Sequence, residues 1–580
     1  MNLRAEYSAR LWTINGNRRL LCARLVVPGI LVTCALSARA QQPGCEYKDI
    51  DVAKYGNQPF QNPPSIESQN GSLSTTLTVQ YTDAAKTSLG GCPLKLRSYN
   101  GLVVGPTLRI KPGDVLDVNL NNQLPKETPD EIQAQFNQEN SSAWLGTMPN
   151  SYNTTNLHFH GLHVSPAGNS DNVLLAIAPQ SQFAYEVKVP STHPIGTYWY
   201  HAHAHGSTAI QVGSSMAGAI IIEDDPNKIP KSLRDATANE KILVIQTILY
   251  DTDGKLDDIT KLFPGPAHPN PTNCAQAGNL GTWPCAKRWE TVNGQIVPII
   301  TMRPGEVQRW RLIDTSFRES VSFFVQGHPL YEIALDGNYL GRVDMWPANT
   351  PLDLEPGYRS DVLIQALQSD AGKTFQMFDA PSPAATSLRG VEEPEHLLAI
   401  LKVDGEPMNM ALPTSAEMAP LAPFGGTDLR KTALGVQQVT FKLGGDMQGQ
   451  KGYFQVNYQS FNPTHIRQLV LNSTEMWALT TVGDPTGVPN PVAPPPPHVF
   501  HIHVNPFQWA RTGPDGKPEL VWKDTLLVQG PAITNIYTKY TDYIGQFVMH
   551  CHILDHEDLG MMEMEEVVDS ASGVRNGHHH

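Results

Sequence analysis

Apolar residues along this 580-residue chain occur in short runs, with Gly, Pro and polar residues between them. The runs are rich in Val, Ile, Thr and Tyr, as at 197–203 (TYWYHAH), 217–224 (AGAIIIED) and 240–250 (EKILVIQTILY). Short runs of these residues between turn signals are typical of strands in β-sandwich domains. The pattern therefore predicts an all-β fold.

Helical periodicity is confined to a few segments, and the clearest is an acidic insertion at 128–145. No stretch after residue 40 is long and apolar enough to span a bilayer, so we expect no membrane span. A chain of 580 residues has room for about three or four domains of ordinary size.

The amino terminus has the order of parts found in an export signal. An arginine-rich segment precedes an apolar run at 25–36, and the small-residue pattern Ala-Arg-Ala, a signal for cleavage, ends at Ala40. We expect residues 1–40 to be removed and the protein to be periplasmic or secreted. Arg18 and Arg19 would suit the twin-arginine route, and an ordinary secretory signal is the alternative.

The charge balance bears on the partners of the exported protein. Residues 1–40 hold six Arg and one Glu, so their removal takes the net charge from −14 to −19. Such an acidic protein is a poor candidate for binding nucleic acid or anionic membranes.

Two stretches of the chain resemble each other. NGLVVGPTLRIKPGDVLDVNL begins at Asn100, and NGQIVPIITMRPGEVQRWRL begins at Asn293. Two prolines and a glycine recur 192 residues later, with Pro106, Pro112 and Gly113 matching Pro298, Pro304 and Gly305. Self-similarity of this kind predicts repeated structural units.

Histidines recur in four H-x-H pairs. The pairs are His158 and His160, His201 and His203, His501 and His503, and His550 and His552. On a strand, residues i and i+2 share a face about 7 Å apart, so both rings of a pair can reach one metal ion or two adjacent ions. The first two pairs are 43 residues apart and the last two are 49 apart, which again indicates a repeat.

The segment HCHILDHEDLGM, which begins at His550, concentrates ligands for a soft metal. An electron-transfer copper takes two histidines, one cysteine and a weak axial methionine, and Cys551, His556 and Met561 supply three of these four. If 547–552 forms a strand, Cys551 points to one face and the flanking histidines point to the other. One strand could then hold copper on each side, with a covalent bridge between the sites.

These motifs resemble those of the multicopper oxidases, a family that includes laccases, bilirubin oxidases, ascorbate oxidases and bacterial cuprous oxidases. The resemblance covers nearly all of the chain after residue 40, and it is most similar to the bacterial three-domain members. It rests on YNGLVVGPTLRIKPGD, NLHFHGLHV, GTYWYHAHAHGSTAIQ, HVFHIH and HCHILDHEDLGMM, in that order.

The resemblance implies three consecutive cupredoxin-like Greek-key β-sandwich domains. We expect an N-terminal arm at 41–70, domains at 71–225, 240–403 and 435–570, and a C-terminal tail at 571–580. The middle domain has only His328 where the others have pairs, so we expect a spacer that also shapes a substrate surface.

The resemblance also implies four copper ions per chain. The type 1 copper would take His498, Cys551, His556 and axial Met561, and the type 2 copper would take His158 and His501. The type 3 pair would take His160, His201, His203, His503, His550 and His552, and the sequence does not say which three bind each ion. A shifted pair of His203 with His205 is the weaker alternative, and His163, His193 and His205 are expected to be structural or to support ligands.

The activity implied is laccase-like. Phenols, aromatic amines or other small reducing molecules would be oxidised one electron at a time at type 1 copper, and O2 would be reduced to water at the trinuclear cluster. Cuprous oxidase and bilirubin oxidase-like activities are close alternatives, and a monomer is expected. Glu557 and Asp171 are implied as proton-relay carboxylates; a solvated Glu557 and a simple turn at Asp171 are the alternatives.

A copper-sequestering or envelope scaffold protein on the same fold is the non-enzymatic alternative. Scaffold relatives lose the copper ligands, whereas this chain keeps all ten expected histidines together with Cys551 and Met561, so an enzyme is favoured. Met408, Met410 and Met418 could form a path for cuprous ions, but a disordered linker is favoured, because methionine-rich inserts are denser.

Five cysteines follow residue 40, and an odd count in an exported protein indicates one thiol with a separate role. We predict disulfides between Cys274 and Cys285 and between Cys45 and Cys92. Cys551 would then be free for copper.

Overall fold

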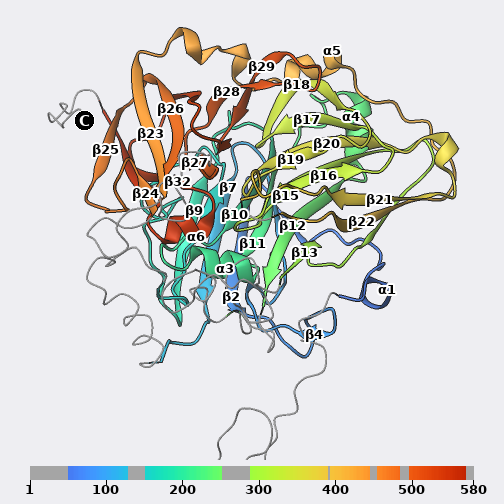
Figure 1. Ribbon diagram of the computed structural model, residues 1–580, viewed down its shortest axis with the longest axis horizontal. Helices are drawn as coiled ribbons and strands as arrows, with labels where there is room; N and C mark the ends of the chain where they lie inside the picture. The colour runs from blue at the N-terminus through green and yellow to red at the C-terminus, as the bar shows by residue number, and fades with distance from the viewer. Residues whose placement is uncertain are drawn as a thin grey trace, which may run out of the picture. The chain divides into compact units, whose positions relative to one another are not determined.

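The structure is a computed structural model, and it describes residues 50–128, 150–250, 256, 288–388, 392–443, 454–483 and 495–569. The described residues are mostly strands, with a few short helices (Figure 1). The predicted all-β fold is therefore confirmed. None of the helices that the structure describes has the length and apolar character needed to cross a membrane. The predicted signal segment lies outside the described residues, as does nearly all of the predicted helix at 128–145.

The first pair of sheets has strand orders β1-β6-β11-β10-β8 and β5-β2-β7-β9. Side chains from both sheets share one apolar core, so the two sheets form a sandwich, called the first sandwich below. Its strands are β1 (Ser65–Glu67), β2 (Ser72–Tyr81), β5 (Arg97–Tyr99), β6 (Thr107–Ile110), β7 (Val115–Asn122), β8 (His158–His160), β9 (Ser181–Lys188), β10 (Gly196–His201) and β11 (Ala217–Ile222), and a separate ribbon joins β3 (Ser88–Leu89) to β4 (Cys92–Pro93).

The second sandwich has strand orders β13-β12-β15-β20-β17-β18 and β14-β22-β21-β16-β19. Its strands are β12 (Lys241–Leu249), β13 (Arg288–Val292), β14 (Ile299–Met302), β15 (Val307–Asp314), β16 (Val321–Val325), β17 (Leu330–Leu335), β18 (Asn338–Trp346), β19 (Leu352–Leu354), β20 (Arg359–Gln365), β21 (Thr374–Asp379) and β22 (His396–Val403).

The third sandwich has strand orders β24-β23-β26-β31-β28-β29 and β25-β33-β32-β27-β30. Its strands are β23 (Gly435–Leu443), β24 (Phe454–Val456), β25 (Ile466–Val470), β26 (Thr474–Gly483), β27 (His498–Ile502), β28 (Phe507–Thr512), β29 (Pro518–Lys523), β30 (Thr525–Val528), β31 (Thr534–Lys539), β32 (Gly545–Cys551) and β33 (Met562–Val568).

Short helices connect or cap these sheets. They are α1 (Val52–Tyr55), α3 (Thr208–Ser214), α4 (Lys231–Thr237), α5 (Ser415–Met418) and α6 (Leu554–Asp558), with 3-10 turns at Gln368–Asp370, Ala419–Leu421, Pro423–Gly426 and Leu429–Lys431. Within the predicted arm, α1 and β1 are the regular elements of the described residues, and Pro59 pairs with Ile299 beside β14. The domain boundaries given above stay predictions.

The internal repeat corresponds to the same pair of turns in the first two sandwiches. Asn100 and Asn293 both have positive φ, 57° and 55°, and each precedes a glycine with positive φ, as a tight hairpin turn requires. Gly113 and Gly305 also have positive φ, 93° and 75°, and each follows a proline, the pattern of a type II turn. The Asn and Gly residues shared by the two stretches therefore occupy backbone conformations with positive φ, which few other residues adopt readily.

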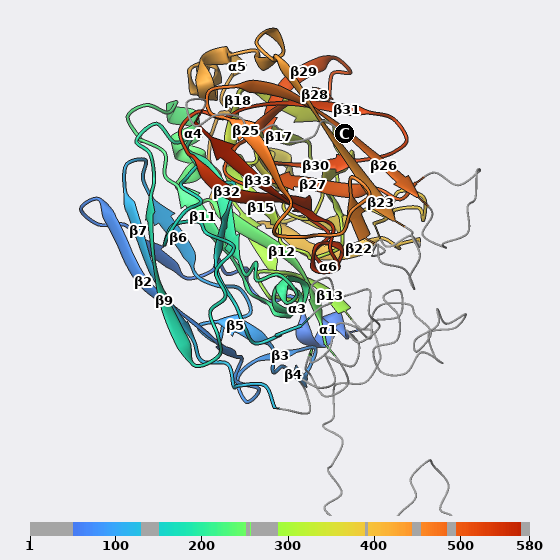
Figure 2. The same cartoon turned by 90° about the vertical axis from the view of Figure 1, so that its left-hand side faces the viewer.

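Strand pairing brings the histidine pairs together within each sandwich. In the first, His158 is opposite His201 on the β8–β10 ladder. In the third, His501 is opposite His550 on the β27–β32 ladder. The two ladders meet, because the rings of His158 and His503 stack with centroids 3.9 Å apart. Beside them, α3 and α6 lie side by side (Figure 1 and Figure 2).

Burial of Glu355, between β19 and β20 in the second sandwich, makes the stability of the protein depend on pH. Burial raises the pKa of this carboxyl to about 7, although a hydrogen bond from Ser320 opposes the shift. The folded pKa lies above the unfolded value of 4.5, so this contribution to stability is complete below pH 4.5 and is lost as pH rises to about 7.

We therefore expect Glu355→Gln to gain stability relative to the unsubstituted protein as pH rises. The gain between pH 4.5 and about 7 should approach about 3 kcal/mol, from the size of the shift, and should be constant above that range. Denaturant unfolding at several pH values measures it. A difference that does not change with pH would contradict a buried, protonated Glu355.

Candidate metal centre

Residues at the end of β32 belong to separate groups of possible metal ligands, which lie on opposite sides of the strand. Cys551 groups with His498 and His556, whereas His550 and His552 group with histidines from the first sandwich. All of these side chains are buried. The alternation of side chains along the strand produces this division, because neighbouring residues point to opposite faces.

The group around Cys551 brings one sulfur and two ring nitrogens together. Its Sγ is 3.5 Å from Nδ1 of His498 and 3.9 Å from Nδ1 of His556, and the two Nδ1 atoms are 3.3 Å apart. Met561 is buried in the same core, and its carbonyl accepts a hydrogen bond from the Cys551 backbone N–H at 3.0 Å. The group offers two nitrogens and one sulfur to a single ion.

Eight further imidazoles form the second set of possible metal ligands. Their possible ligand atoms fall into groups within 4.8 Å: His158, His160 and His501; His160, His201 and His552; and His203, His503 and His550. Each group takes residues from both the first and the third sandwich. Neither sandwich could form these groups alone.

Several of these imidazoles use one ring nitrogen in a hydrogen bond and turn the other toward the group. Nδ1 of His201 and Nδ1 of His550 each point at the carbonyl of the following residue, at 2.9 and 3.0 Å, and Nδ1 of His501 points at the Asp524 carbonyl at 2.8 Å. Because a carbonyl oxygen only accepts, each Nδ1 carries the proton and each Nε2 is a bare acceptor. Nε2 of His201 and of His501 have no hydrogen-bond partner.

Ring nitrogens converge in the group around His550, whose own Nε2 carries no proton. This Nε2 is 3.1 Å from Nε2 of His203 and 3.2 Å from Nε2 of His503. Burial, together with neighbouring imidazoles, lowers the pKa of all three rings well below the usual value, so the rings are neutral and none carries a second proton. A metal ion bound at about 2.0–2.1 Å from each nitrogen fits this spacing. A set of imidazoles and one thiolate suits copper.

The group around Cys551 has the same electrostatic character. Burial lowers the pKa of His498 to about 3, so its ring is neutral at neutral pH. Burial also raises the pKa of Cys551 to about 12, so the side chain is a thiol unless a cation replaces the proton. Without a cation, the group around Cys551 is therefore neutral at neutral pH.

Asp171 lies against the first histidine pair. Its Oδ1 accepts a hydrogen bond from the Phe159 backbone N–H at 3.0 Å and lies 2.9 Å from Nδ1 of His158. Its Oδ2 is buried without a hydrogen-bond partner. Burial raises the pKa of Asp171 to about 8. Asp171 thus orients a ring whose Nε2 is free.

Glu557 lies between two rings of the group around His550. Its Oε1 accepts a hydrogen bond from Thr208 at 3.2 Å and lies 3.5 Å from Nδ1 of His203. Its Oε2 is 3.4 Å from Nδ1 of His550 and has no hydrogen-bond partner. Burial, with a smaller contribution from Asp558, raises the pKa of Glu557 well above the usual value.

The sequence analysis missed two carboxylates that support this region. Asp524 contacts His160 at 3.1 Å. Asp558 accepts backbone N–H bonds from Gly206 at 2.7 Å and Ala209 at 2.8 Å, and so joins α6 to the start of α3. No sequence signal marks either residue, since their partners lie 364, 352 and 349 positions away.

The remaining histidines near the pairs make local contacts. His163 hydrogen-bonds the Val504 carbonyl through Nδ1 at 2.8 Å, and its backbone N–H donates to Nε2 of His193 at 2.9 Å. The ring of His205 packs against Phe461, with centroids 4.8 Å apart. These contacts are structural, as expected.

The structure contradicts a disordered linker around Met408, Met410 and Met418. Met418 lies in α5 and is buried in an apolar cluster with Leu233 and Ile333. The backbone N–H of Val307 approaches Sδ of Met410 at 3.5 Å. Met410 and Met418 pack against the second sandwich because their side chains join this apolar cluster.

The cysteines are described in part. Cys551 is free and buried, and Cys92 is disulfide-bonded. Cys45, Cys274 and Cys285 lie outside the described residues, so both predicted pairings stay predictions.

Comparisons with known proteins agree with this geometry. Family models described as multicopper oxidase match residues 137–227, 259–405 and 436–570. A laccase of Bacillus subtilis (strain 168) is 25% identical over 524 residues, which cover 82% of this chain and 91% of the laccase.

Solved structures share the fold. A multicopper oxidase from Campylobacter jejuni, described as a metallo-oxidase, has a TM-score of 0.66 at 21% identity and covers 89% of this chain and 97% of its own. A laccase-like multi-copper oxidase from Ochrobactrum sp. has a TM-score of 0.62 at 22% identity and covers 88% of this chain and 100% of its own.

The three family matches together cover more than half of the chain, and the fold of three consecutive cupredoxin-like sandwiches is confirmed. Copper binding follows from the family and from the donor groups described above. The chain therefore belongs to the multicopper oxidase family and is an oxidoreductase.

Proposed function

We propose that the protein is a laccase-like oxidase with four copper sites. The type 1 ion would be held by His498, Cys551 and His556, and Met561, buried in the same core, would be the fourth ligand. The type 2 site takes His158 and His501. For the type 3 sites we propose His160, His201 and His552 for one ion and His203, His503 and His550 for the other, and the grouping of their possible ligand atoms supports this division.

One observation carries this proposal: Nε2 of His203 and Nε2 of His503 both lie 3.1–3.2 Å from the bare, buried Nε2 of His550, whose single lone pair can accept a hydrogen bond from only one of them, whereas a cation could bind all three nitrogens. When bound, the copper ions supply one-electron oxidation of a reducing molecule at the type 1 site and four-electron reduction of O2 to water at the other three. The substrates proposed are phenols, aromatic amines and related small donors.

The covalent chain provides the path between the sites. Cys551 belongs to the type 1 group, and its two neighbours, His550 and His552, belong to the two type 3 groups. The Nδ1 proton of His550 is held by the Cys551 carbonyl at 3.0 Å, which gives a second, hydrogen-bonded connection. Cys551 would therefore connect an ion held by its sulfur to ions held by His550 and His552 through one residue of covalent chain on either side.

Asp171 and Glu557 are proposed to hold and deliver protons. Each is fully buried, contacts a ligand ring and keeps one carboxyl oxygen without a hydrogen-bond partner. Such an oxygen can accept or donate a proton in a site from which water is excluded. Thr208 fixes the other oxygen of Glu557.

The laccase-like substrate class is supported by what relatives are known to do. The Bacillus subtilis relative is a laccase, and the Ochrobactrum enzyme is described as having oxidase activity towards lignin model compounds and lignosulfonate. The Campylobacter jejuni enzyme is described as a metallo-oxidase, which supports Cu(I) as the alternative donor. We further propose export through residues 1–40, on the sequence pattern alone.

Copper content tests the ligand assignment. Fully loaded protein should hold four ions per chain, and Cys551→Ser should lose the blue absorption and turnover while keeping three ions and the fold. Elemental analysis and visible absorption measure both. Four ions retained in Cys551→Ser, or turnover that survives, would contradict the assignment of Cys551.

A steady-state comparison tests the substrate class. Copper-loaded protein is assayed with 2,6-dimethoxyphenol, Cu(I) and bilirubin at matched O2, and we expect the phenol to have the highest kcat/KM. Dominant turnover of Cu(I) would make the protein a cuprous oxidase, and dominant turnover of bilirubin would make it bilirubin oxidase-like.

Glu557→Gln should slow reoxidation of the reduced enzyme by O2 by about 10²-fold, because positioned proton transfer contributes about 10²–10⁴. Reduction of the type 1 site should keep its rate. Stopped-flow absorption separates the two steps. Glu565→Gln is the matched control, since Glu565 is also a fully buried carboxyl but lies in β33. Equal reoxidation rates in the two variants would remove Glu557 from the relay.

A further inference from the structure

Asp524 lies between a ligand imidazole and a buried arginine. It joins β29 to β30, and only 3% of it is exposed. Its Oδ1 is 3.1 Å from Nε2 of His160. Arg359 donates from Nη1 to Oδ1 at 2.8 Å and from Nη2 to Oδ2 at 2.5 Å. The carboxylate therefore connects a ring of the first sandwich to a guanidinium of the second.

Two ligand rings, those of His160 and His501, stack on each other and both contact Asp524. The rings of His160 and His501 are parallel, with centroids 3.9 Å apart and an interplanar angle of 9°. The Asp524 carbonyl accepts from Nδ1 of His501 at 2.8 Å. Oγ1 of Thr525 lies 3.1 Å from Nε2 of His160 and 3.1 Å from Nδ1 of His501, and it donates to Oδ1 of Asp524 at 2.7 Å.

These contacts set opposite tautomers in the two rings. An ionised carboxylate only accepts hydrogen bonds, so Nε2 of His160 carries the proton and Nδ1 is bare. The carbonyl of the same residue keeps the proton of His501 on Nδ1, so its Nε2 is bare. Nδ1 of His160 and Nε2 of His501 are indeed buried without hydrogen-bond partners. One residue thus decides which atom each ring offers to a metal.

Arg359 makes further hydrogen bonds besides those to Asp524. Its side chain is fully buried, and it also donates to the Gly357 carbonyl at 2.9 Å and to the Thr197 carbonyl at 3.3 Å. A Cβ at Gly161, the residue after His160, would lie 2.4 Å from Nη2 of Arg359 and 2.6 Å from Oδ2 of Asp524. Only glycine leaves room for this ion pair beside the first histidine pair.

We propose that the Arg359–Asp524 ion pair is a positioning element of the trinuclear centre. Through it the second sandwich, to which no copper ligand is assigned, fixes the tautomer and orientation of His160 and holds in place the residue whose backbone carbonyl accepts from His501. The inference rests on the proposed copper sites. Carboxylates that hold a ligand histidine in this way contribute about 10–100-fold to metal affinity.

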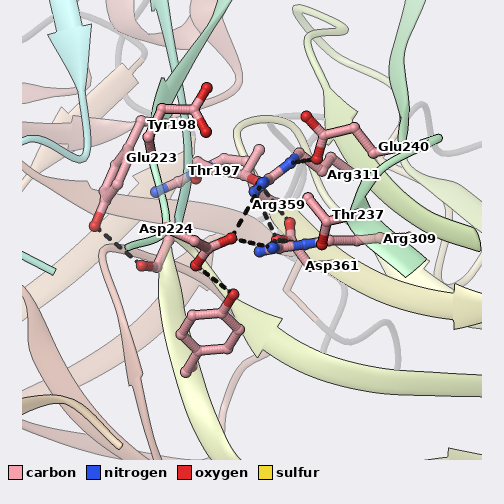
Figure 3. Close-up of polar contacts among 12 residues, drawn as sticks. Thr197, Tyr198, Glu223, Asp224, Thr237, Glu240, Arg309, Arg311, Arg359 and Asp361 are labelled. Atoms are coloured by element: carbon pink, nitrogen blue, oxygen red, sulfur yellow. Dashed lines mark hydrogen bonds and ion pairs between the residues drawn. The ribbon is translucent and has the colours of Figure 1, made fainter. Parts of the chain in front are cut away.

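A second buried ion network provides the matched control. Asp361 accepts from Arg309 through Nε at 3.1 Å and from Arg311 through Nη1 at 3.0 Å, and Thr197 donates to its other oxygen at 2.6 Å (Figure 3). Asp361 is as buried as Asp524 and also bridges the first and second sandwiches. Its partners in these bonds are arginines and a threonine, none of which is an assigned ligand.

The experiment compares Asp524→Asn with Asp361→Asn in the copper-loaded, full-length protein. Each is dialysed against increasing chelator, and copper per chain, type 1 absorption and the electron paramagnetic resonance of the type 2 ion are recorded. We expect Asp524→Asn to release trinuclear copper at about 10–100-fold lower chelator and to change the type 2 spectrum, with type 1 absorption unchanged. Asp361→Asn should lower the unfolding temperature but retain copper as the unsubstituted protein does.

Equal copper retention in the two Asn variants, with an unchanged type 2 spectrum, would overturn the proposal. So would parallel losses, which would indicate general destabilisation. If Asp524→Asn does not fold, Arg359→Lys decides, since it keeps the charge but loses the two-point contact. It should show the same change in the type 2 spectrum, and an unaltered spectrum would exclude a role for the second sandwich. Fewer than four ions in the unsubstituted protein would instead count against the proposed function.

Discussion

The structure depends on one electrostatic constraint: in a buried site, Nε2 of His203 and Nε2 of His503 both lie 3.1–3.2 Å from Nε2 of His550, which carries no proton. Backbone carbonyls hold the protons of several rings on the outer nitrogen, and burial keeps the rings from taking a second proton. The single lone pair on Nε2 of His550 can accept a hydrogen bond from only one of its two neighbours. A metal ion would bind all three nitrogens at once, so metal binding would stabilise the packing of the first sandwich against the third.

This constraint explains why the middle sandwich matters although no ligand is assigned to it. Each group needs rings from both the first and the third sandwich at fixed positions. Asp524, which contacts His160 and His501, is itself held by Arg359 of the second sandwich. Arg359 reaches Asp524 and the Thr197 carbonyl, and so connects all three sandwiches at the point where His160 and His501 stack. Asp558 connects two parts of the chain, because it joins α6 to the backbone at the start of α3.

Features that depend on nearby residues could be predicted from the sequence. The H-x-H pairs and the alternation around Cys551 follow from strand geometry, and the repeat at Asn100 and Asn293 marks a turn that needs positive φ. The division of the six type 3 histidines between two ions could not be predicted, because each group of three combines residues hundreds of positions apart. Asp524 could not be identified from the sequence either. It lies between two strands, where polar residues are common, and folding alone brings it into contact with His160. The ordered segment around Met418 was missed because its apolar partners, such as Leu233, lie far away in the chain.

Copper-edge anomalous diffraction from crystals of the fully loaded protein tests the central claim most directly. Four peaks are predicted: one between Cys551, His498 and His556, and three among the eight imidazoles of the other groups, with Cys551 and its two neighbours connecting them. Anomalous density absent from the space between His203, His503 and His550, while those rings keep the same positions, would contradict the account.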